Sequence, residues 1–222
     1  MNKLTLENVS YAYKGAERKA LDDISVEFQG GKIYAVIGPS GSGKTTLLSI
    51  LAGLDIPTEG EVFINNTKLS TLDLDQYRRE QVSMIFQAFH LFPMLNVVEN
   101  VSFPMELNGV ERAEARTRAK VFLNSVGITD EKHRRFPSNL SGGEQQRVAI
   151  ARTMASGARV ILADEPTGNL DKENGQNIVD ILKVLAHENG YCVIIVTHDP
   201  AIAEQADQVY AMDDGRMTEA RD

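Results

Sequence analysis

The stretch Gly38-Pro39-Ser40-Gly41-Ser42-Gly43-Lys44-Thr45 decides the fold class of this chain. It fits the pattern G-x-x-x-x-G-K-[ST], and it lies between the unbroken apolar run of residues 33–37 and a segment of helical composition, residues 45–52. A strand, a glycine-rich loop and a helix in this order indicate a buried parallel strand followed by a crossover. The alternative, a glycine-rich turn that merely starts a helix, does not account for the eight-residue match. The stretch therefore predicts an α/β fold with a phosphate-binding loop.

The residue types of this loop indicate its chemistry. Its glycines let backbone N–H groups converge on phosphate oxygens at the N-terminus of a helix. Lys44 is expected to reach the β- and γ-phosphates of a nucleotide, and the Thr45 hydroxyl can ligate Mg²⁺. The nucleotide-binding residues expected in this part of the chain are Gly38, Pro39, Ser40, Gly41, Ser42, Gly43, Lys44, Thr45 and Thr46.

A second candidate element is the acidic pair Asp164-Glu165, which follows the apolar run of residues 160–163. Carboxylates at the end of a buried strand are costly unless a cation meets them. Asp164 is therefore the expected partner of Mg²⁺, and Glu165 can poise a water molecule for attack on the γ-phosphorus. Taken alone, the pair could equally start a surface turn with Pro166 and Gly168. Beside a phosphate-binding loop, the catalytic interpretation is favoured.

The other patterns along the chain predict one α/β core. Residues 192–196 form another continuous apolar run, as expected for a strand covered on both faces, and an amphipathic helix is predicted over 173–188. Apolar residues at period two within the first thirty positions predict short strands with an antiparallel edge. Helical composition over 111–126 and 143–155 predicts a helical insertion in the middle of the chain.

Composition excludes several classes of protein. The 222 residues are 42% apolar and 24% charged, which is ordinary for a soluble globular domain. A net charge of −8 argues against nucleic acid as the main partner, because a phosphate-backbone binder needs a basic face. The single cysteine, Cys192, is expected to be a small buried hydrophobe in a reducing cytoplasm. We expect neither a signal peptide nor a membrane span, since no apolar run is long enough.

The residues Leu140-Ser141-Gly142-Gly143-Glu144-Gln145-Gln146-Arg147 closely resemble the signature sequence of ATP-binding-cassette (ABC) ATPases, and they precede the acidic pair as in that family. Ser141 and Glu144 also fit a capping box, a common way to start a helix. That alternative does not explain Gly142 and Gly143, which are poor helix formers and would allow close approach of a phosphate. The resemblance implies that all four residues contact nucleotide.

The resemblance extends over nearly the whole chain. Tyr13 matches the aromatic residue that stacks on adenine; Tyr11 is the second choice, and a tyrosine packed in an edge sheet is the alternative. Gln87 matches the family glutamine that touches Mg²⁺ and the attacking water, and His198 matches the histidine that contacts the γ-phosphate. Asn169-Leu170-Asp171 matches a loop that crosses the dimer interface. No role is assigned to His90, His133 and His187.

The family resemblance implies a P-loop NTPase (RecA-like) parallel-sheet core with an N-terminal antiparallel β subdomain and an inserted α-helical subdomain. Residues 1–222 would form a single ABC ATPase domain, with 1–86 and 157–222 as the core and β subdomain and 87–156 as the helical subdomain. ATP and Mg²⁺ would bind between two copies, because the signature of one completes the site of the other. The implied catalytic residues are Glu165, His198, Gln87 and Lys44, and the implied metal-binding residues are Thr45, Gln87 and Asp164.

Residues 164–171 are typical of the MacB, LolD and FtsE group of ABC proteins, although Asn96 stands where the group usually carries threonine. Residues 86–100 resemble the region that receives a helix of the membrane permease. The resemblance implies a subunit that is homodimeric or paired with a second ABC ATPase. The subunit would be peripheral on the cytoplasmic face of the cell membrane. There it would power export of drugs, peptides or lipoproteins. Because the chain ends soon after Arg216, no accessory C-terminal domain is expected.

Two other functions are alternatives to transport. A regulatory ABC ATPase of a membrane complex, as in cell division, would share all of this chemistry, so the sequence leaves that alternative open. An ABC ATPase of DNA repair would carry long coiled-coil or zinc-bearing insertions. This chain has neither long heptad repeats nor cysteine clusters, which disfavours that class.

Overall fold

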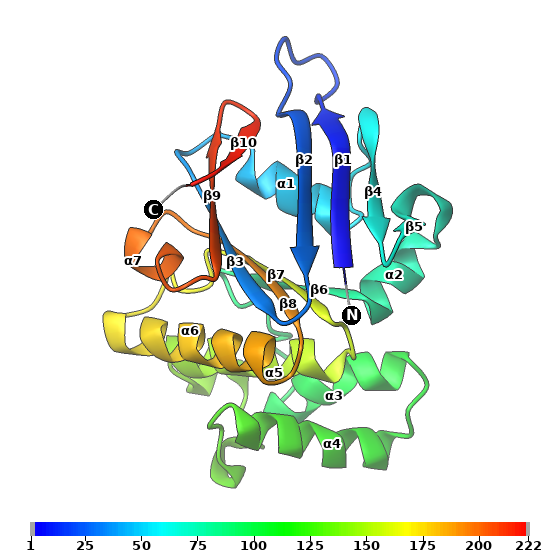
Figure 1. The fold of residues 1–222 in the computed structure, drawn as a ribbon. Helices are drawn as coiled ribbons and strands as arrows, with labels where there is room; N and C mark the ends of the chain where they lie inside the picture. The colour runs from blue at the N-terminus through cyan, green and yellow to red at the C-terminus, as the bar shows by residue number, and fades with distance from the viewer. Residues whose placement is uncertain (1–2, 221–222) are drawn as a thin grey trace.

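A six-stranded sheet forms the centre of the molecule, in a computed structural model that describes residues 3–220 (Figure 1). Its strand order is β10-β9-β3-β8-β7-β6, in which β9, β3, β8, β7 and β6 are parallel and β10 pairs antiparallel with β9. The bounds are β3 Lys32–Ile37, β6 Val82–Phe86, β7 Val160–Asp164, β8 Cys192–Val196, β9 Gln208–Asp213 and β10 Arg216–Glu219. The predicted parallel-sheet core is thereby confirmed.

A second, antiparallel sheet packs above one end of the first and has the order β2-β1-β4-β5 (Figure 1). Its strands are β1 Lys3–Tyr11, β2 Leu21–Gln29, β4 Glu59–Ile64 and β5 Thr67–Lys68. The alternating apolar residues predicted in β1 and β2 lie opposite each other, as Leu4 does with Phe28 and Leu6 with Val26. The antiparallel region is therefore a separate sheet, not an edge added to the parallel one.

The helices divide between the two faces of the central sheet. Their bounds are α1 Lys44–Leu51, α2 Leu74–Glu80, α3 Val97–Leu107, α4 Arg112–Ser125, α5 Gly142–Ala155, α6 Lys172–His187 and α7 Pro200–Ala203. Helix α1 lies between the two sheets, whereas α6, α5, α3 and α4 lie on the opposite face (Figure 1). Short 3-10 turns occupy Leu69–Thr71, Asp130–Lys132 and Pro137–Asn139.

Two hydrophobic cores result from this arrangement, because successive side chains of a strand point to opposite faces of its sheet. In β8, Ile194 packs with α1 and the antiparallel sheet, and its neighbour Ile195 packs with the helices of the other face. Cys192 is buried in the first core, where burial raises the pKa of its thiol to about 12. The expectation that Cys192 is a small buried hydrophobe is confirmed. Within residues 3–220, no helix combines the length and the apolarity needed to cross a membrane.

Candidate nucleotide-binding site

The phosphate-binding loop, the acidic pair Asp164-Glu165 and His198 meet at the carboxyl ends of β3, β7 and β8. Parallel strands bring the loops that follow them to one edge of the sheet, and ligands bind there in open α/β sheets. The hollow at this edge has a volume of about 510 Å³. It is lined by Tyr13, Ala20, Gly38, Ser40, Gly41, Gly43, Lys44, Thr45, Thr46, Asp164, Glu165, Val196 and His198.

The loop between β3 and α1 requires glycine at two positions because other parts of the chain approach it closely. A Cβ atom on Gly38 would lie 2.1 Å from the carbonyl oxygen of Met212. A Cβ atom on Gly43 would lie 2.3 Å from the carbonyl oxygen of Ala20. Gly43 is also the N-cap of α1, and no side chain within residues 3–220 caps that helix. The first N–H groups of α1 are therefore available to a phosphate, at the positive end of the helix dipole.

Lys44 places its charge inside this loop. Its Nζ atom donates hydrogen bonds to the carbonyl oxygens of Gly38, at 2.8 Å, and Pro39, at 2.7 Å. The ammonium group is thus held where the backbone N–H groups of the loop already favour an anion. A phosphate chain at this position would meet both the dipole and the cation.

Asp164, the first residue of the acidic pair, is poorly neutralised by the residues around it. Burial and the adjacent Glu165 carboxylate raise the pKa of Asp164 above its ordinary value, although Lys44 acts in the opposite direction. A half-buried carboxylate in this condition is stabilised by a divalent cation. Thr45 lines the same hollow and offers a hydroxyl oxygen. Oxygen ligands of these two kinds suit Mg²⁺, so the residues present fit this ion.

Glu165 has a backbone conformation that is rare for its residue type, with φ at +47°. Its carboxylate is held by two neighbours from the loop after β8. Oε1 lies 2.8 Å from Nδ1 of His198, and Oε2 accepts a hydrogen bond of 3.3 Å from the hydroxyl of Thr197. Strained non-glycine conformations of this kind cluster at active sites. Thr197 was not singled out from the sequence, where its only signal was its place beside His198.

His198 faces the hollow with an exposed side chain, 75% accessible. The hydrogen bond and the charge of Glu165 raise the pKa of His198 above its ordinary value. The three other histidines do not line the hollow, and each makes a structural contact in another part of the fold. His133 is buried, His187 pairs with Asp207, and His90 stacks on Phe86.

Tyr13 is the tyrosine that lines the hollow, and it is 50% exposed. Its hydroxyl lies 3.0 Å from the hydroxyl of Thr46 in α1. Tyr11 is partly buried and packs against Tyr13 without lining the hollow. The geometry therefore favours Tyr13 over Tyr11 as a surface on which a base could stack.

Gln87 lies apart from the residues that line the hollow. Its side-chain Nε2 donates a 3.1 Å hydrogen bond to Oδ1 of Asn169, whose Nδ2 in turn donates to the Gln87 carbonyl oxygen at 2.9 Å. The Gln87 amide also lies against Gly168, where an added Cβ atom would meet it at 2.8 Å. The structure therefore joins Gln87 to the loop after Pro166, a contact that the sequence did not indicate.

The signature residues also lie outside this hollow, at the start of α5. Ser141 and Glu144 form a reciprocal capping box: Ser141 Oγ accepts from the Glu144 N–H at 3.3 Å, and the Ser141 N–H donates to Glu144 Oε2 at 2.8 Å. A Cβ atom on Gly143 would lie 2.4 Å from Oδ1 of Asn174, so packing against α6 requires glycine there. Gly142 makes only ordinary contacts. Capping and packing thus account for three of the four residues within one chain.

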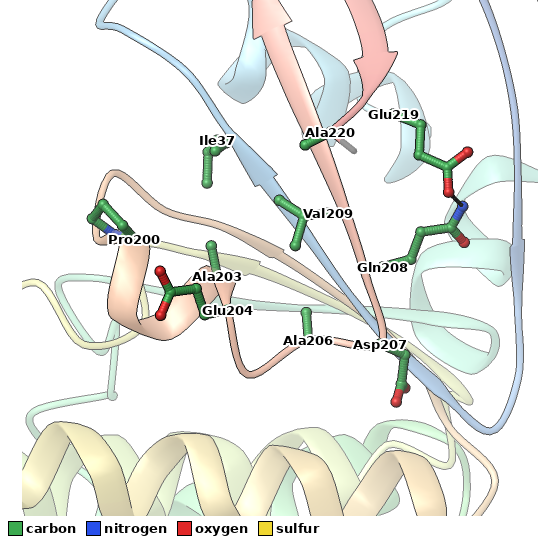
Figure 2. A pocket seen from close by; sticks show the side chains of 10 residues that line it. All are labelled: Ile37, Pro200, Ala203, Glu204, Ala206, Asp207, Gln208, Val209, Glu219 and Ala220. Atoms are coloured by element: carbon green, nitrogen blue, oxygen red, sulfur yellow. Dashed lines mark hydrogen bonds between the residues drawn. The ribbon is translucent and has the colours of Figure 1, made fainter. Parts of the chain in front are cut away.

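Another hollow, of about 690 Å³, lies beside α7 and β9 (Figure 2). Most of its polar side chains are already paired. Asp207 binds His187 and the N–H of Ile33, and Gln208 donates to Glu219. Within residues 3–220, the side chains that line this hollow belong to none of the predicted motifs, so it is not the nucleotide site.

The parallel sheet, the glycine cradle and the acidic pair together define a P-loop nucleotide-binding protein. Residues 21–168 match the family model described as ABC transporter. The chain belongs to the ABC transporter family.

Relatives of known sequence agree with this assignment. The chain is 42% identical over 220 residues to an uncharacterized ABC transporter ATP-binding protein, Rv0986, of Mycobacterium tuberculosis, covering 97% of this chain and 88% of the relative. It is 45% identical over 219 residues to the macrolide export ATP-binding/permease protein MacB of Salmonella typhimurium. That match covers 96% of this chain but only 34% of MacB.

Among solved structures, the chain is similar to the ATP-binding cassette MJ0796, described as a dimer in a post-hydrolysis state bound to ADP and Pi. The TM-score is 0.87 at 39% identity, and the match covers 99% of both chains. The fold class predicted from the sequence is confirmed by this similarity.

Proposed function

We propose that this chain binds Mg·ATP in the hollow above β3, β7 and β8 and hydrolyses it between two copies of the chain. The observation that carries the proposal is the convergence of the glycine cradle, Lys44, the acidic pair and His198 on one edge of the sheet. The family provides the class of reaction, and the likeness to a dimeric cassette supports the two-copy arrangement.

In this proposal each residue has one task. The loop N–H groups and Lys44 hold the phosphates, while Thr45 and Asp164 hold Mg²⁺, which supplies neutralisation of the developing charge. Glu165 accepts a proton from the attacking water, and His198 contacts the γ-phosphate. Tyr13 stacks on the base. Gln87 would approach Mg²⁺ with its Oε1 atom, since its Nε2 atom donates to Asn169.

The signature residues Ser141 to Glu144 are proposed to face the nucleotide of the partner copy. Their distance from the hollow of their own chain is what a split site requires. Gly142 supports this role most directly, because no atom of residues 3–220 excludes a Cβ atom there. In the same proposal, residues 1–86 and 157–222 form the core and the β subdomain, and residues 87–156 form the helical subdomain that carries the signature.

We further propose that the dimer lies at the cytoplasmic face of a membrane and drives a permease. MacB carries ATP-binding and permease functions in one protein, as its name states, and this chain matches about a third of it. A partner subunit with the permease function would complete the same assembly. The surface around Phe92 and Met94, both exposed, lies within the region expected to receive it.

Glu165→Gln tests the central proposal. The variant keeps the shape of the side chain but cannot accept the proton, so turnover should fall about 10²-fold or more. It also removes a negative charge from each γ-phosphate site, so the ATP-bound dimer should accumulate. Size-exclusion chromatography with light scattering should show twice the monomer mass with Mg·ATP and not with Mg·ADP.

The matched control is Glu188→Gln, which changes an exposed carboxylate at the end of α6. It should hydrolyse ATP at the wild-type rate and form no stable dimer. A Glu165→Gln variant that stays monomeric in ATP and hydrolyses it at the wild-type rate would contradict the proposal.

A further inference from the structure

Two tyrosines at the end of β1 form an edge-to-face pair. The ring centroids of Tyr11 and Tyr13 lie 5.0 Å apart, and the ring planes meet at 86°. Such pairs are stabilised by the quadrupoles of the rings, beyond the burial of their area. Only Tyr13 lines the nucleotide hollow, whereas Tyr11 contacts Tyr13 from outside it. The orientation of the Tyr13 ring therefore depends on the position of Tyr11.

Tyr11 is itself fixed by a chain of hydrogen bonds. Its hydroxyl donates to Oδ1 of Asp55 at 3.1 Å, and Oδ2 of Asp55 accepts a hydrogen bond from the hydroxyl of Ser49. Burial and the Asp55 carboxylate raise the pKa of Tyr11 above its ordinary value, so the phenol remains a donor. The two carboxylate oxygens of Asp55 thus accept one hydrogen bond each, from Tyr11 and from Ser49.

Both ends of this chain of contacts lead to α1, the helix that follows the phosphate-binding loop. Ser49 belongs to the last turn of α1, and Thr46, which contacts the hydroxyl of Tyr13, belongs to its first turn. The Tyr13 ring is therefore contacted by Tyr11, which Asp55 and Ser49 hold, and its hydroxyl is contacted by Thr46. These contacts fix the ring relative to the loop that would hold the phosphates.

We propose that Tyr11, supported by Asp55 and Ser49, is a positioning residue that holds the Tyr13 ring ready to stack on the base of the nucleotide. A ring that is fixed before binding loses less conformational freedom when a base stacks on it, and this strengthens binding. The inference rests on the proposed nucleotide site, and it adds a determinant of affinity that does not itself touch the nucleotide.

The test compares a ligand that has a base with one that lacks it. Dissociation constants for Mg·ATP and for magnesium tripolyphosphate are measured by isothermal titration. Tyr11→Phe removes only the hydroxyl and should weaken Mg·ATP about threefold. Tyr11→Ala also removes the ring edge and should weaken it up to about tenfold. Asp55→Ala should behave like Tyr11→Phe. Tripolyphosphate binding should be unchanged in all three variants.

Two controls separate positioning from a general loss of structure. Tyr210→Phe removes a hydroxyl from a tyrosine of the central sheet and should change neither constant. In a Tyr13→Ala background, Tyr11→Phe should cause no further loss, because the ring that it positions is gone. Thermal unfolding of each variant is recorded, and Tyr11→Phe, which keeps the packed ring, decides the outcome if Tyr11→Ala does not fold.

The possible results distinguish this inference from the proposed function. If Tyr13→Ala weakens Mg·ATP and Tyr11→Phe does not, the positioning role is overturned and the nucleotide site stands. Equal weakening of tripolyphosphate, or a Tyr11 effect that persists without Tyr13, also overturns the positioning role. If Tyr13→Ala leaves Mg·ATP affinity unchanged, the proposed base site fails, and this inference fails with it.

Discussion

The Nδ1 atom of His198 lies 2.8 Å from Oε1 of Glu165, across the loops that follow β8 and β7. The two residues for which we propose different tasks, contact with the γ-phosphate and activation of water, are therefore electrostatically coupled. The hydrogen bond and the charge of Glu165 stabilise the imidazolium form of His198.

This coupling predicts a pH dependence. The pKa of His198 is raised above its ordinary value of 6.5, with the hydrogen bond to Glu165 as the largest cause. The contribution of the His198–Glu165 pair to the free energy of unfolding should therefore be fully present below about pH 6.5. This contribution should be lost as the pH rises through the pKa of His198 in the folded protein. An NMR titration of the imidazole should show a lower His198 pKa in Glu165→Gln than in wild type.

His187 is the internal control for this titration, because its partner is Asp207 and not Glu165. At any one pH, its imidazole chemical shifts should be the same in both proteins. An unchanged His198 pKa in Glu165→Gln would mean that the pair is not populated in solution.

A second prediction concerns Lys44. Lys44→Ala removes the cation from the loop, so Mg·ATP affinity should fall about 10-fold to 100-fold, as for loss of a charged hydrogen bond. Isothermal titration measures the effect, with Lys120→Ala on the exposed face of α4 as the matched loss of charge. Lys44 also bridges two loop carbonyls, so the melting temperature is recorded to show that the fold persists. Wild-type affinity in Lys44→Ala would remove Lys44 from the site.

A third prediction separates the two roles of Ser141. Ser141→Ala removes the cap of α5 and should lower the free energy of unfolding by about 1 kcal/mol. Ser141→Arg should in addition place a bulky cation where the partner copy would present its γ-phosphate. It should leave ATP binding by the monomer nearly unchanged while blocking dimerisation and turnover. If Ser141→Arg hydrolyses ATP normally, Ser141 is only a helix cap.

A fourth prediction concerns the packing of α5 on α6. Gly143→Ala would bring a Cβ atom to 2.4 Å from Oδ1 of Asn174, and should lower the free energy of unfolding by about 1–3 kcal/mol. Asn174→Ala removes the nearest atoms, so the double variant should recover part of this loss. Urea denaturation of the two single variants and the double variant gives the coupling. Strict additivity would show that the two residues do not compete for space.

The sequence predicted the elements whose signals are local. The apolar run of residues 192–196 coincides with β8, and the helices predicted over 111–126 and 173–188 differ from α4 and α6 by about one residue at each end. Helix α3 was not predicted, because Val97, Val98 and Val101 favour strands and Pro104 lies inside it.

One local signal in the sequence does indicate the start of α3. Asn96 is its N-cap, and Glu99 completes a capping box with it. Asparagine and threonine are both good N-cap residues, so the departure from threonine at Asn96 preserves the local structure.

The Gln87–Asn169 contact had no such local signal in the sequence. It joins residues 82 positions apart and depends on how β6 and β7 pair, which side-chain types alone do not specify.

The left-handed backbone conformation of Glu165 lowers the stability of the fold at a residue that we propose acts in hydrolysis. A non-glycine residue in that conformation costs on the order of 1–3 kcal/mol, which glycine would largely avoid. A library of variants selected only for resistance to heat should therefore enrich Glu165→Gly, and under the role proposed for Glu165 the survivors would be robust but inert. Efforts to stabilise this cassette for structural or industrial use must fix residue 165 and seek improvement elsewhere.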